Sequence, residues 1–177
     1  MKLIIARHGE TIENQKGIIQ GHLHGTLTEK GLNQAKTVAK KLKDTKIDII
    51  YSSDLKRSLE TAKEIAKFHD CPLEPTEELR ERYLAELQGK SKEELGHTKE
   101  TSVAIFENHS GETREQMFNR AKNFLNKIIE KHKNQIVLIV SHNGINKAII
   151  SAINGTGPEG IPEIPNMDND EIKEFDL

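Results

Sequence analysis

The sequence predicts an α/β fold, a three-layer sandwich in which helices cover both faces of a mostly parallel sheet. Short apolar runs alternate with longer segments whose apolar residues recur at helical spacing. Three of the apolar runs end directly at polar or cationic residues, which is typical of buried parallel strands that stop at one edge of a sheet. Because 177 residues suffice for one such core, we expect a single domain over residues 1–177.

The first half of the chain alternates strands with helices. An apolar run over residues 2–6 predicts the first strand, and helical spacing predicts a helix over residues 28–42. A second apolar run over residues 48–51 predicts the next strand, and Asp54 after it is expected to cap the following helix. The prolines in residues 72–75 predict a short edge strand, since proline is tolerated at sheet edges.

The second half begins with a polar, mixed segment, residues 77–109, which predicts loop and short helix. The clearest amphipathic pattern follows over residues 117–129 and predicts a long helix. The apolar run over residues 135–140 predicts the third strong strand, and a helix is expected over residues 144–153. A loop rich in glycine and proline then leads to residues 171–177, where a last edge strand is expected.

Composition excludes several classes of partner. Charged residues make up 31% of the chain, with a net charge of −2 and both signs interspersed, so we expect no binding to nucleic acid or to a membrane. Cys71 is the single cysteine, so no internal disulfide can form. No apolar stretch approaches the roughly 20 residues that span a bilayer. The N-terminal apolar run is too short for a signal sequence, and we expect a cytoplasmic protein.

Polar and cationic groups follow the three strong strands. Arg7-His8 follows the first, Ser52-Ser53 leads from the second to Arg57, and Ser141-His142 follows the third. Neighbouring strand ends would bring these groups together. Arginine forks bind phosphate oxygens, and a neutral imidazole can attack phosphorus when its other nitrogen is held by an acceptor. The pattern therefore favours phosphoryl transfer without a metal, with a carboxylic acid still needed for the leaving group.

Several short sequence blocks are distributed along the chain in an order and at a spacing that match one known family. The blocks are Arg7-His8-Gly9-Glu10-Thr11, Asn14, Gln20-Gly21, residues 27–31, Gln34-Ala35, residues 52–57, residues 79–82, Gly111-Glu112-Thr113 and Val140-Ser141-His142. In these blocks, which extend over nearly the whole chain, the sequence resembles the histidine phosphatase superfamily, the phosphoglycerate mutase-like enzymes. A lone Arg-His-Gly would be weak evidence, whereas the ordered set is specific.

The resemblance implies a role for each matching residue. His8 is the nucleophile, and Glu81 protonates the leaving group and then helps to activate water. Arg7, Arg57 and His142 hold the phosphoryl group. The residues expected to complete or support the phosphate and substrate site are Thr11, Asn14, Gln20, Gly21 and Asn143. The implied reaction is hydrolysis of a small phosphorylated metabolite through a phosphohistidine, with no metal and no other cofactor, by a monomer or a homodimer.

Two alternatives to a phosphatase stay open. Glu81-Arg82-Tyr83 and Leu87-Gln88-Gly89, with Lys92 beyond, resemble the sequence of cofactor-dependent phosphoglycerate mutases. The same stretch, with residues 16–21 and Gly111-Glu112-Thr113, also resembles small fructose-bisphosphatase-type members of the family. Mutases of the family are usually longer, with inserted segments that exclude water, and this chain has little room for them, so a phosphatase is favoured. The second alternative is a non-catalytic protein that binds a phosphorylated ligand. The complete set of catalytic residue types argues against it.

Three positions depart from the family pattern. His24 stands where many members have Asp, Thr26 where they have Pro, and Asn143 where they usually have Gly. If residue 143 adopted a left-handed backbone conformation, Asn would tolerate it better than most residues. These departures leave the implied chemistry intact but weaken any assignment of substrate by analogy.

Other polar residues permit less specific interpretations. Glu86 is a rival to Glu81, because both lie in one charge-rich segment. Arg82, Lys90 and Lys92 fit either the non-reacting end of an anionic substrate or a solvated face. A metal site is disfavoured, because the four histidines that could suggest one lack a recognised ligand spacing. Those histidines are His22, His24, His97 and His109.

Overall fold

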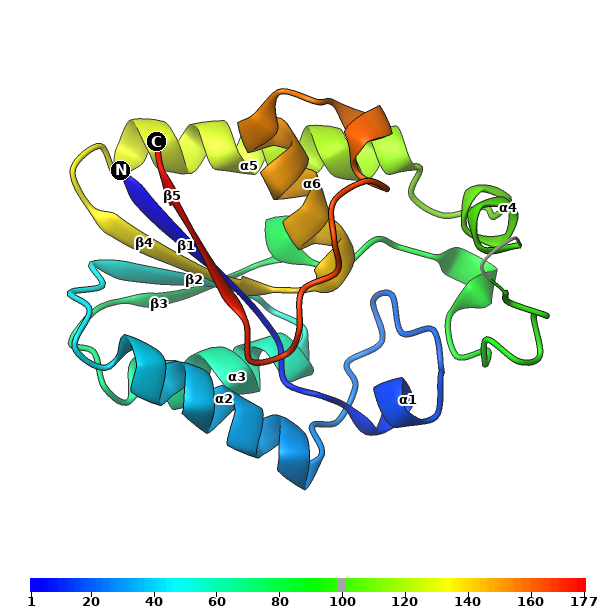
Figure 1. The fold of residues 1–177 in the computed structure, drawn as a ribbon, viewed down its shortest axis with the longest axis horizontal. Coiled ribbons are helices and arrows are strands. Elements are labelled where there is room, and N and C mark those ends of the chain that lie inside the picture. The colour runs from blue at the N-terminus through cyan, green and yellow to red at the C-terminus, as the bar shows by residue number, and fades with distance from the viewer. Residues whose placement is uncertain (99–100) are drawn as a thin grey trace.

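The computed structural model describes residues 1–98 and 101–177 and contains one five-stranded sheet (Figure 1). The strands are β1 (Lys2–Arg7), β2 (Ile49–Ser53), β3 (Leu73–Thr76), β4 (Ile136–Ser141) and β5 (Ile172–Asp176). Their order across the sheet is β3-β2-β4-β1-β5, and only β5 pairs antiparallel to its neighbour. The mostly parallel sheet and both predicted edge strands are confirmed.

Helices cover both faces of this sheet, as the predicted sandwich requires (Figure 1). One face carries α2 (Glu29–Leu42) and α3 (Lys56–Ala66), and the other carries α5 (Arg114–Lys131) and α6 (Asn143–Asn154). Successive residues of a strand pack against helices on opposite faces of the sheet, because side chains along a strand point alternately to the two sides. In β1, Leu3 and Ile5 pack toward α5 and α6, whereas Ile4 and Ala6 pack toward α2 and α3.

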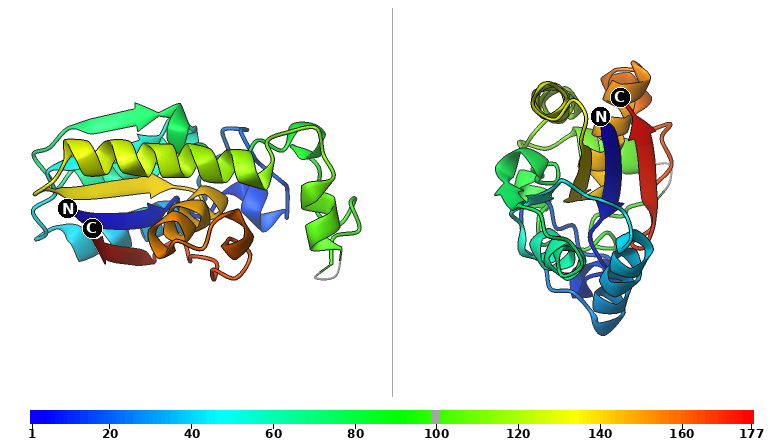
Figure 2. Two further views of the ribbon diagram at one scale, coloured as in Figure 1. Left: turned by 90° about the horizontal axis from the view of Figure 1, so that it is seen from above. Right: turned by 90° about the vertical axis from the view of Figure 1, so that its left-hand side faces the viewer.

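A smaller layer of loops and short helices lies beyond the carboxyl ends of the parallel strands. The left view of Figure 2 shows α4 (Ser102–Glu107) standing out from the sandwich on that side. The short elements of this layer also include α1 (Ile12–Gln15), η1 (Glu77–Leu79) and η2 (Ala85–Leu87), and η3 (Pro158–Gly160) lies in the loop before β5. Ile19, Leu84 and Leu87 form a small separate apolar cluster that joins two of these loops. Function-bearing loops are expected at this edge of the sheet.

Two local details differ from the sequence expectations. Asp54 does not cap α3, because its carboxylate accepts two hydrogen bonds from the Arg80 guanidinium at 2.8 and 2.5 Å, and Leu55 occupies the cap position without a side-chain bond. The short helix α1 was not predicted, although Thr11 and Asn14 form a reciprocal capping box at its start. Within the described ranges, no helix is both long and apolar enough to cross a bilayer.

Candidate active site

Two histidines and one arginine meet where β1, β4 and β2 end. Arg7 of β1 is in register with Ser141 of β4, and the His8 backbone N–H donates to the Ser141 carbonyl at 2.9 Å. The rings of His8 and His142 therefore lie 5.1 Å apart between centroids. Arg57, in the first turn of α3, reaches both rings and is buried with them. The expected convergence of strand ends is confirmed.

The hydrogen bonds around His8 define its tautomer. Its Nδ1 lies 2.7 Å from the Gly9 carbonyl, which can only accept, so Nδ1 carries the proton. Its Nε2 then has a lone pair, which accepts from Arg57 Nε at 3.3 Å. This leaves Nε2 as the nucleophilic atom of a neutral, positioned imidazole.

His142 has the opposite tautomer. Its Nδ1 accepts from the same Arg57 Nε at 3.1 Å, so the proton resides on Nε2. That Nε2 is buried and has no hydrogen-bond partner among the described residues. Because a buried donor without a partner is costly, His142 Nε2 is suited to donate to an acceptor that enters the site.

Burial and positive neighbours hold both histidines neutral. Desolvation is the main cause that lowers the pKa of His8 far below its ordinary value, and the charges of Arg57 and Arg7 add to it. Desolvation also lowers the pKa of His142, with Arg57 as the next contributor. A neutral ring is required for a nucleophile at His8, and a neutral His142 can still donate through its Nε2.

Arg57 is held on several sides by backbone carbonyls of the loop that follows α1. Its Nη2 donates to Gly21 at 2.9 Å, and its Nη1 donates to Leu23 and, at 3.4 Å, to His24. Burial lowers the pKa of Arg57 to about 10, which keeps the guanidinium charged at neutral pH. His24 thus takes part through its backbone, so the side-chain departure from the family pattern leaves this contact in place.

Arg7 and the loop before β5 form the other wall. Arg7 Nη1 donates to the Met167 carbonyl at 2.7 Å, while its Nε has no partner within the part of the chain that the structure describes. Asn143 ties the same loop down, since it donates to Asn166 at 2.9 Å and accepts from the Met167 N–H at 3.0 Å. Asn169 donates to the His8 carbonyl at 2.5 Å. The sequence does not predict the part played by these loop residues, because no local pattern marks them.

Glu81 places its carboxylate at the N-terminus of α6. Its Oε2 accepts from the Gly144 N–H at 2.9 Å, and its Oε1 accepts from the Ile145 N–H at 3.1 Å and its own neighbour Arg82 N–H at 2.9 Å. The positive end of the helix dipole therefore faces this carboxylate. Its rival Glu86 is exposed and accepts instead from the Ser110 backbone and hydroxyl.

A cavity of roughly 500 Å³ opens between these groups. His8, Arg7, Arg57 and Glu81 line it, and so do four of the residues predicted for substrate binding: Asn14, Gln20, Gly21 and Asn143. Thr11 does not line the cavity, because it is buried and its hydroxyl caps α1 by accepting from the Asn14 N–H. Asn143 is the first residue of α6, so the left-handed conformation considered for it does not occur.

No group of three or more histidine, cysteine, aspartate or glutamate side chains within residues 1–98 and 101–177 is arranged to hold a metal ion. His22 instead uses its Nε2 to donate to the Glu81 carbonyl at 2.8 Å, and its ring lies against Tyr83. Of the three cations considered for an anionic substrate, Arg82 and Lys92 line the cavity and Lys90 does not.

Comparison with known proteins identifies the family. The sequence profile of the histidine phosphatase superfamily (branch 1) matches residues 3–177. A metal-independent phosphoserine phosphatase of Arabidopsis thaliana is 36% identical over 169 residues, which cover 90% of this chain and 71% of the relative. An adenosylcobalamin/alpha-ribazole phosphatase of Salmonella typhimurium is 31% identical over 160 residues, with 86% and 79% covered.

The fold agrees with the same assignment. The crystal structure of a phosphoserine phosphatase from Entamoeba histolytica, in complex with 3-phosphoglyceric acid, superposes with a TM-score of 0.83 at 30% identity. The superposition covers 98% of this chain and 89% of that one. The chain therefore belongs to branch 1 of the histidine phosphatase superfamily and is a phosphatase of that superfamily.

Proposed function

We propose that this protein hydrolyses small phosphomonoesters without a metal ion, through a phosphohistidine formed on His8 Nε2. The main observation behind the proposal is that His8 and His142 have opposite tautomers, because the same Arg57 N–H faces Nε2 of one ring and Nδ1 of the other. Arg57 Nε lies 3.3 Å from His8 Nε2 and 3.1 Å from His142 Nδ1, which leaves a lone pair on one ring and an N–H on the other. A nucleophile and a donor are thereby aimed at the same phosphoryl group.

In the first step, His8 Nε2 attacks phosphorus and forms a P–N bond while the ester P–O bond breaks. The electron pair of that bond leaves with the alkoxide, and the mechanism requires that Glu81 be protonated at this step so that it can donate a proton to the alkoxide. Among the described residues, Glu81 Oε2 accepts a single N–H bond and therefore has a lone pair for this proton. Arg7, Arg57 and His142 Nε2 stabilise the negative charge on the equatorial phosphoryl oxygens. Arg7 Nε and His142 Nε2, which have no partner among the residues that the structure describes, supply donors for this, because both are already buried and desolvated.

In the second step, water attacks the phosphorus of phosphohistidine. Glu81, now a carboxylate, accepts a proton from that water as the P–O bond forms and the P–N bond breaks. The electron pair returns to His8 Nε2, inorganic phosphate leaves, and Glu81 is again a carboxylic acid. Each group thus returns to its starting form, so no other co-reactant is required.

The outer part of the cavity favours substrates with a second anionic group. The lining there holds more cations than carboxylates, since Arg82 and Arg114 contact Glu107 at 3.2 and 2.8 Å and Lys92 and Lys147 are further cations. The exposed Glu159 carboxylate lies 3.9 Å from Arg114 and does not line the cavity. Lys147 lines the same cavity, and its ammonium contacts the Pro162 carbonyl at 3.4 Å. A carboxylate on the substrate would complement these charges. Phosphoserine and 3-phosphoglycerate carry such a group, in agreement with the names of two of the relatives.

A panel of phosphomonoesters tests the proposal. In the presence of excess chelator, we expect the protein to release phosphate from phosphoserine or 3-phosphoglycerate with higher kcat/KM than from alkyl phosphates that have an uncharged tail. A gain of roughly tenfold corresponds to one added charged hydrogen bond of about 1.4 kcal/mol. Vanadate should inhibit, because it adopts the geometry of the transferring group. Loss of activity in chelator, restored by a divalent ion, would contradict the mechanism, and a preference for uncharged tails would contradict the substrate class.

A further inference from the structure

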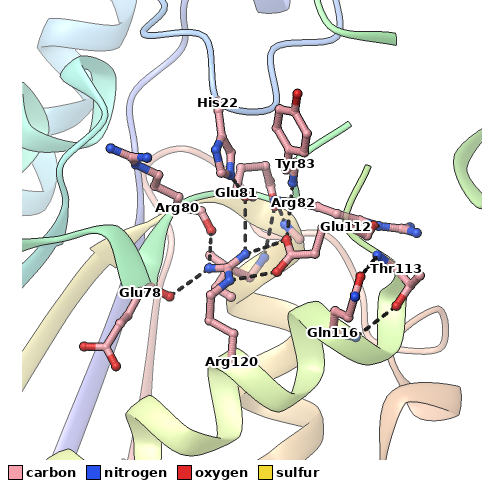
Figure 3. Close-up of polar contacts among 12 residues, drawn as sticks. His22, Glu78, Arg80, Glu81, Arg82, Tyr83, Glu112, Thr113, Gln116 and Arg120 are labelled. Carbon is pink, nitrogen blue, oxygen red and sulfur yellow. Dashed lines mark hydrogen bonds and ion pairs between the residues drawn. The ribbon is translucent and has the colours of Figure 1, made fainter. Parts of the chain in front are cut away.

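The backbone that carries Glu81 is held from outside by one arginine of α5. Arg120 Nη1 donates to the carbonyls of Glu78 and Arg80, both at 2.8 Å, and its Nη2 lies 3.4 Å from the Glu81 carbonyl. Figure 3 shows the guanidinium rising from α5 into the bend of this segment, with its donors facing the carbonyls. A single side chain therefore contacts three of the four residues from Glu78 to Glu81.

The guanidinium is itself oriented by Glu112. Arg120 Nε donates to Glu112 Oε1 at 2.8 Å, and Arg120 Nη2 donates to Glu112 Oε2 at 2.7 Å, which is a bidentate pair (Figure 3). Glu112 also holds the segment just beyond Glu81, because its N–H donates to the Tyr83 carbonyl at 2.8 Å. The two side chains are largely buried, with 22% and 14% of their surfaces exposed.

Residues 80–84 lie between two short 3₁₀ helices and belong to no strand or helix. Their carbonyls therefore have no ladder of regular backbone hydrogen bonds to fix them. Arginine suits this position, since its planar fork offers five donors in fixed directions, whereas lysine concentrates three donors at one point. His22 adds one further donor to the Glu81 carbonyl, from the opposite side.

We infer that Arg120, oriented by Glu112, is a positioning residue for the Glu81 carboxyl group. Arg120 does not line the cavity, so it acts through the backbone of Glu81 rather than on the substrate. The Glu81 side chain reaches the α6 N-terminus only if its backbone is correctly placed, and a misplacement of about 1 Å can cost up to roughly 10²-fold in rate. The inference rests on the proposed role of Glu81 as proton donor.

Single-turnover kinetics with two esters tests this inference. We expect Arg120→Met to slow phosphorylation of the enzyme by an alkyl phosphate by about 10- to 100-fold, because its leaving group needs the Glu81 proton. p-Nitrophenyl phosphate should be slowed much less, since nitrophenolate leaves without a proton. Arg120→Lys keeps a charge next to Glu112 and should fall between wild type and Arg120→Met. It also provides a second, more conservative variant if Arg120→Met does not fold.

Lys127→Met is the matched control. Lys127 lies on the same helix and contacts the same segment, but only through the exposed side chain of Glu78 at 2.9 Å. This variant should leave both esters within about twofold of wild type, as expected for an exposed ion pair. Equal slowing of the two esters by Arg120→Met and Arg120→Lys would show a merely structural role and overturn the inference.

The Glu81→Gln background separates the inference from the proposed function. If Arg120 acts through Glu81, adding Arg120→Met to Glu81→Gln should cost the alkyl ester little more, since neighbouring residues with one shared effect are non-additive. Full additivity would overturn the inference alone. If Glu81→Gln by itself slowed both esters equally, the acid role of Glu81 would fail, and the inference would fail with it.

Discussion

The backbone N–H of Gly144 donates to the Glu81 carboxylate at 2.9 Å, and a Cβ atom built on Gly144 would overlap Glu81 Oε1. Glycine at this position therefore allows the carboxylate to approach the first turn of α6. The requirement is one of space, because residue 144 has ordinary helical backbone geometry.

Gly144→Ala is expected to displace Glu81 and to slow hydrolysis of alkyl phosphates by at least about tenfold, as for a misplaced general acid. The free energy of unfolding should change little, because the preference of helices for alanine over glycine, up to about 1 kcal/mol, offsets the loss of the contact with Glu81. The rates on an alkyl and an aryl ester, together with urea unfolding, check this expectation. A variant with wild-type activity on alkyl esters would show that the close contact is not required.

The two buried histidines predict a loss of stability in mild acid. Burial and nearby arginines lower the pKa of His8 and of His142 in the folded state, while both return to about 6.5 on unfolding. Between those values the unfolded chain binds more protons, so the free energy of unfolding falls as pH falls below 6.5. Each histidine contributes a slope of up to about 1.4 kcal/mol per pH unit.

Urea unfolding from pH 7 to pH 5, with wild type and His8→Gln, measures this contribution. Desolvation also lowers the pKa of His22 and of His69, so the comparison between the two proteins is what isolates His8. The free energy of unfolding of the variant should fall less steeply with decreasing pH than that of the wild type. The difference in slope should be up to about 1.4 kcal/mol per pH unit, which corresponds to one bound proton. Parallel curves for the two proteins would show that His8 is not held neutral by the fold.

Lys147 is expected to contribute to substrate binding rather than to chemistry. Burial lowers its pKa, and the residue lines the cavity, where its ammonium contacts the Pro162 carbonyl at 3.4 Å. Lys147→Met should raise KM for phosphoserine or 3-phosphoglycerate by about tenfold, the value of one charged hydrogen bond. For p-nitrophenyl phosphate, which has no carboxylate, KM should change less than about twofold.

Lys40→Met is the control for this substitution, because Lys40 is exposed on α2 and lies outside the cavity. It should leave KM unchanged for every substrate. Equal increases of KM for carboxylate and aryl substrates in Lys147→Met would show that Lys147 does not recognise the second anionic group.

The sequence predicts much of this site, because its key residues follow strands that are easily identified. His8, His142 and Arg57 lie directly after β1, after β4 and in the first turn after β2, so local patterns and sheet topology suffice to bring them together. Glu81 could be placed only by family resemblance, since residues 77–109 have no strong periodicity.

Contacts between segments far apart in sequence could not be predicted. Asp54 looks like a helix cap locally, but Arg80, 26 residues away, provides a stronger charged partner. From the sequence, Arg120 is one more polar residue on the exposed side of an amphipathic helix. In the structure, it donates hydrogen bonds to backbone carbonyls about 40 residues earlier in the chain. Met167 and Asn169 contact Arg7 and His8 across nearly the whole chain. Such partners are determined by the packed fold and leave no local signal.

Trapping of the phosphorylated enzyme tests the central claim most directly. The protein would be mixed with a ³²P-labelled phosphomonoester, quenched within the first turnover, and analysed for the position and chemical stability of the label. Because the Gly9 carbonyl keeps the proton of His8 on Nδ1, Nε2 is the His8 atom with a lone pair for attack, and we expect label on His8 that is labile in acid and stable in alkali. Label that is stable in acid, or that persists in His8→Ala, would contradict the mechanism.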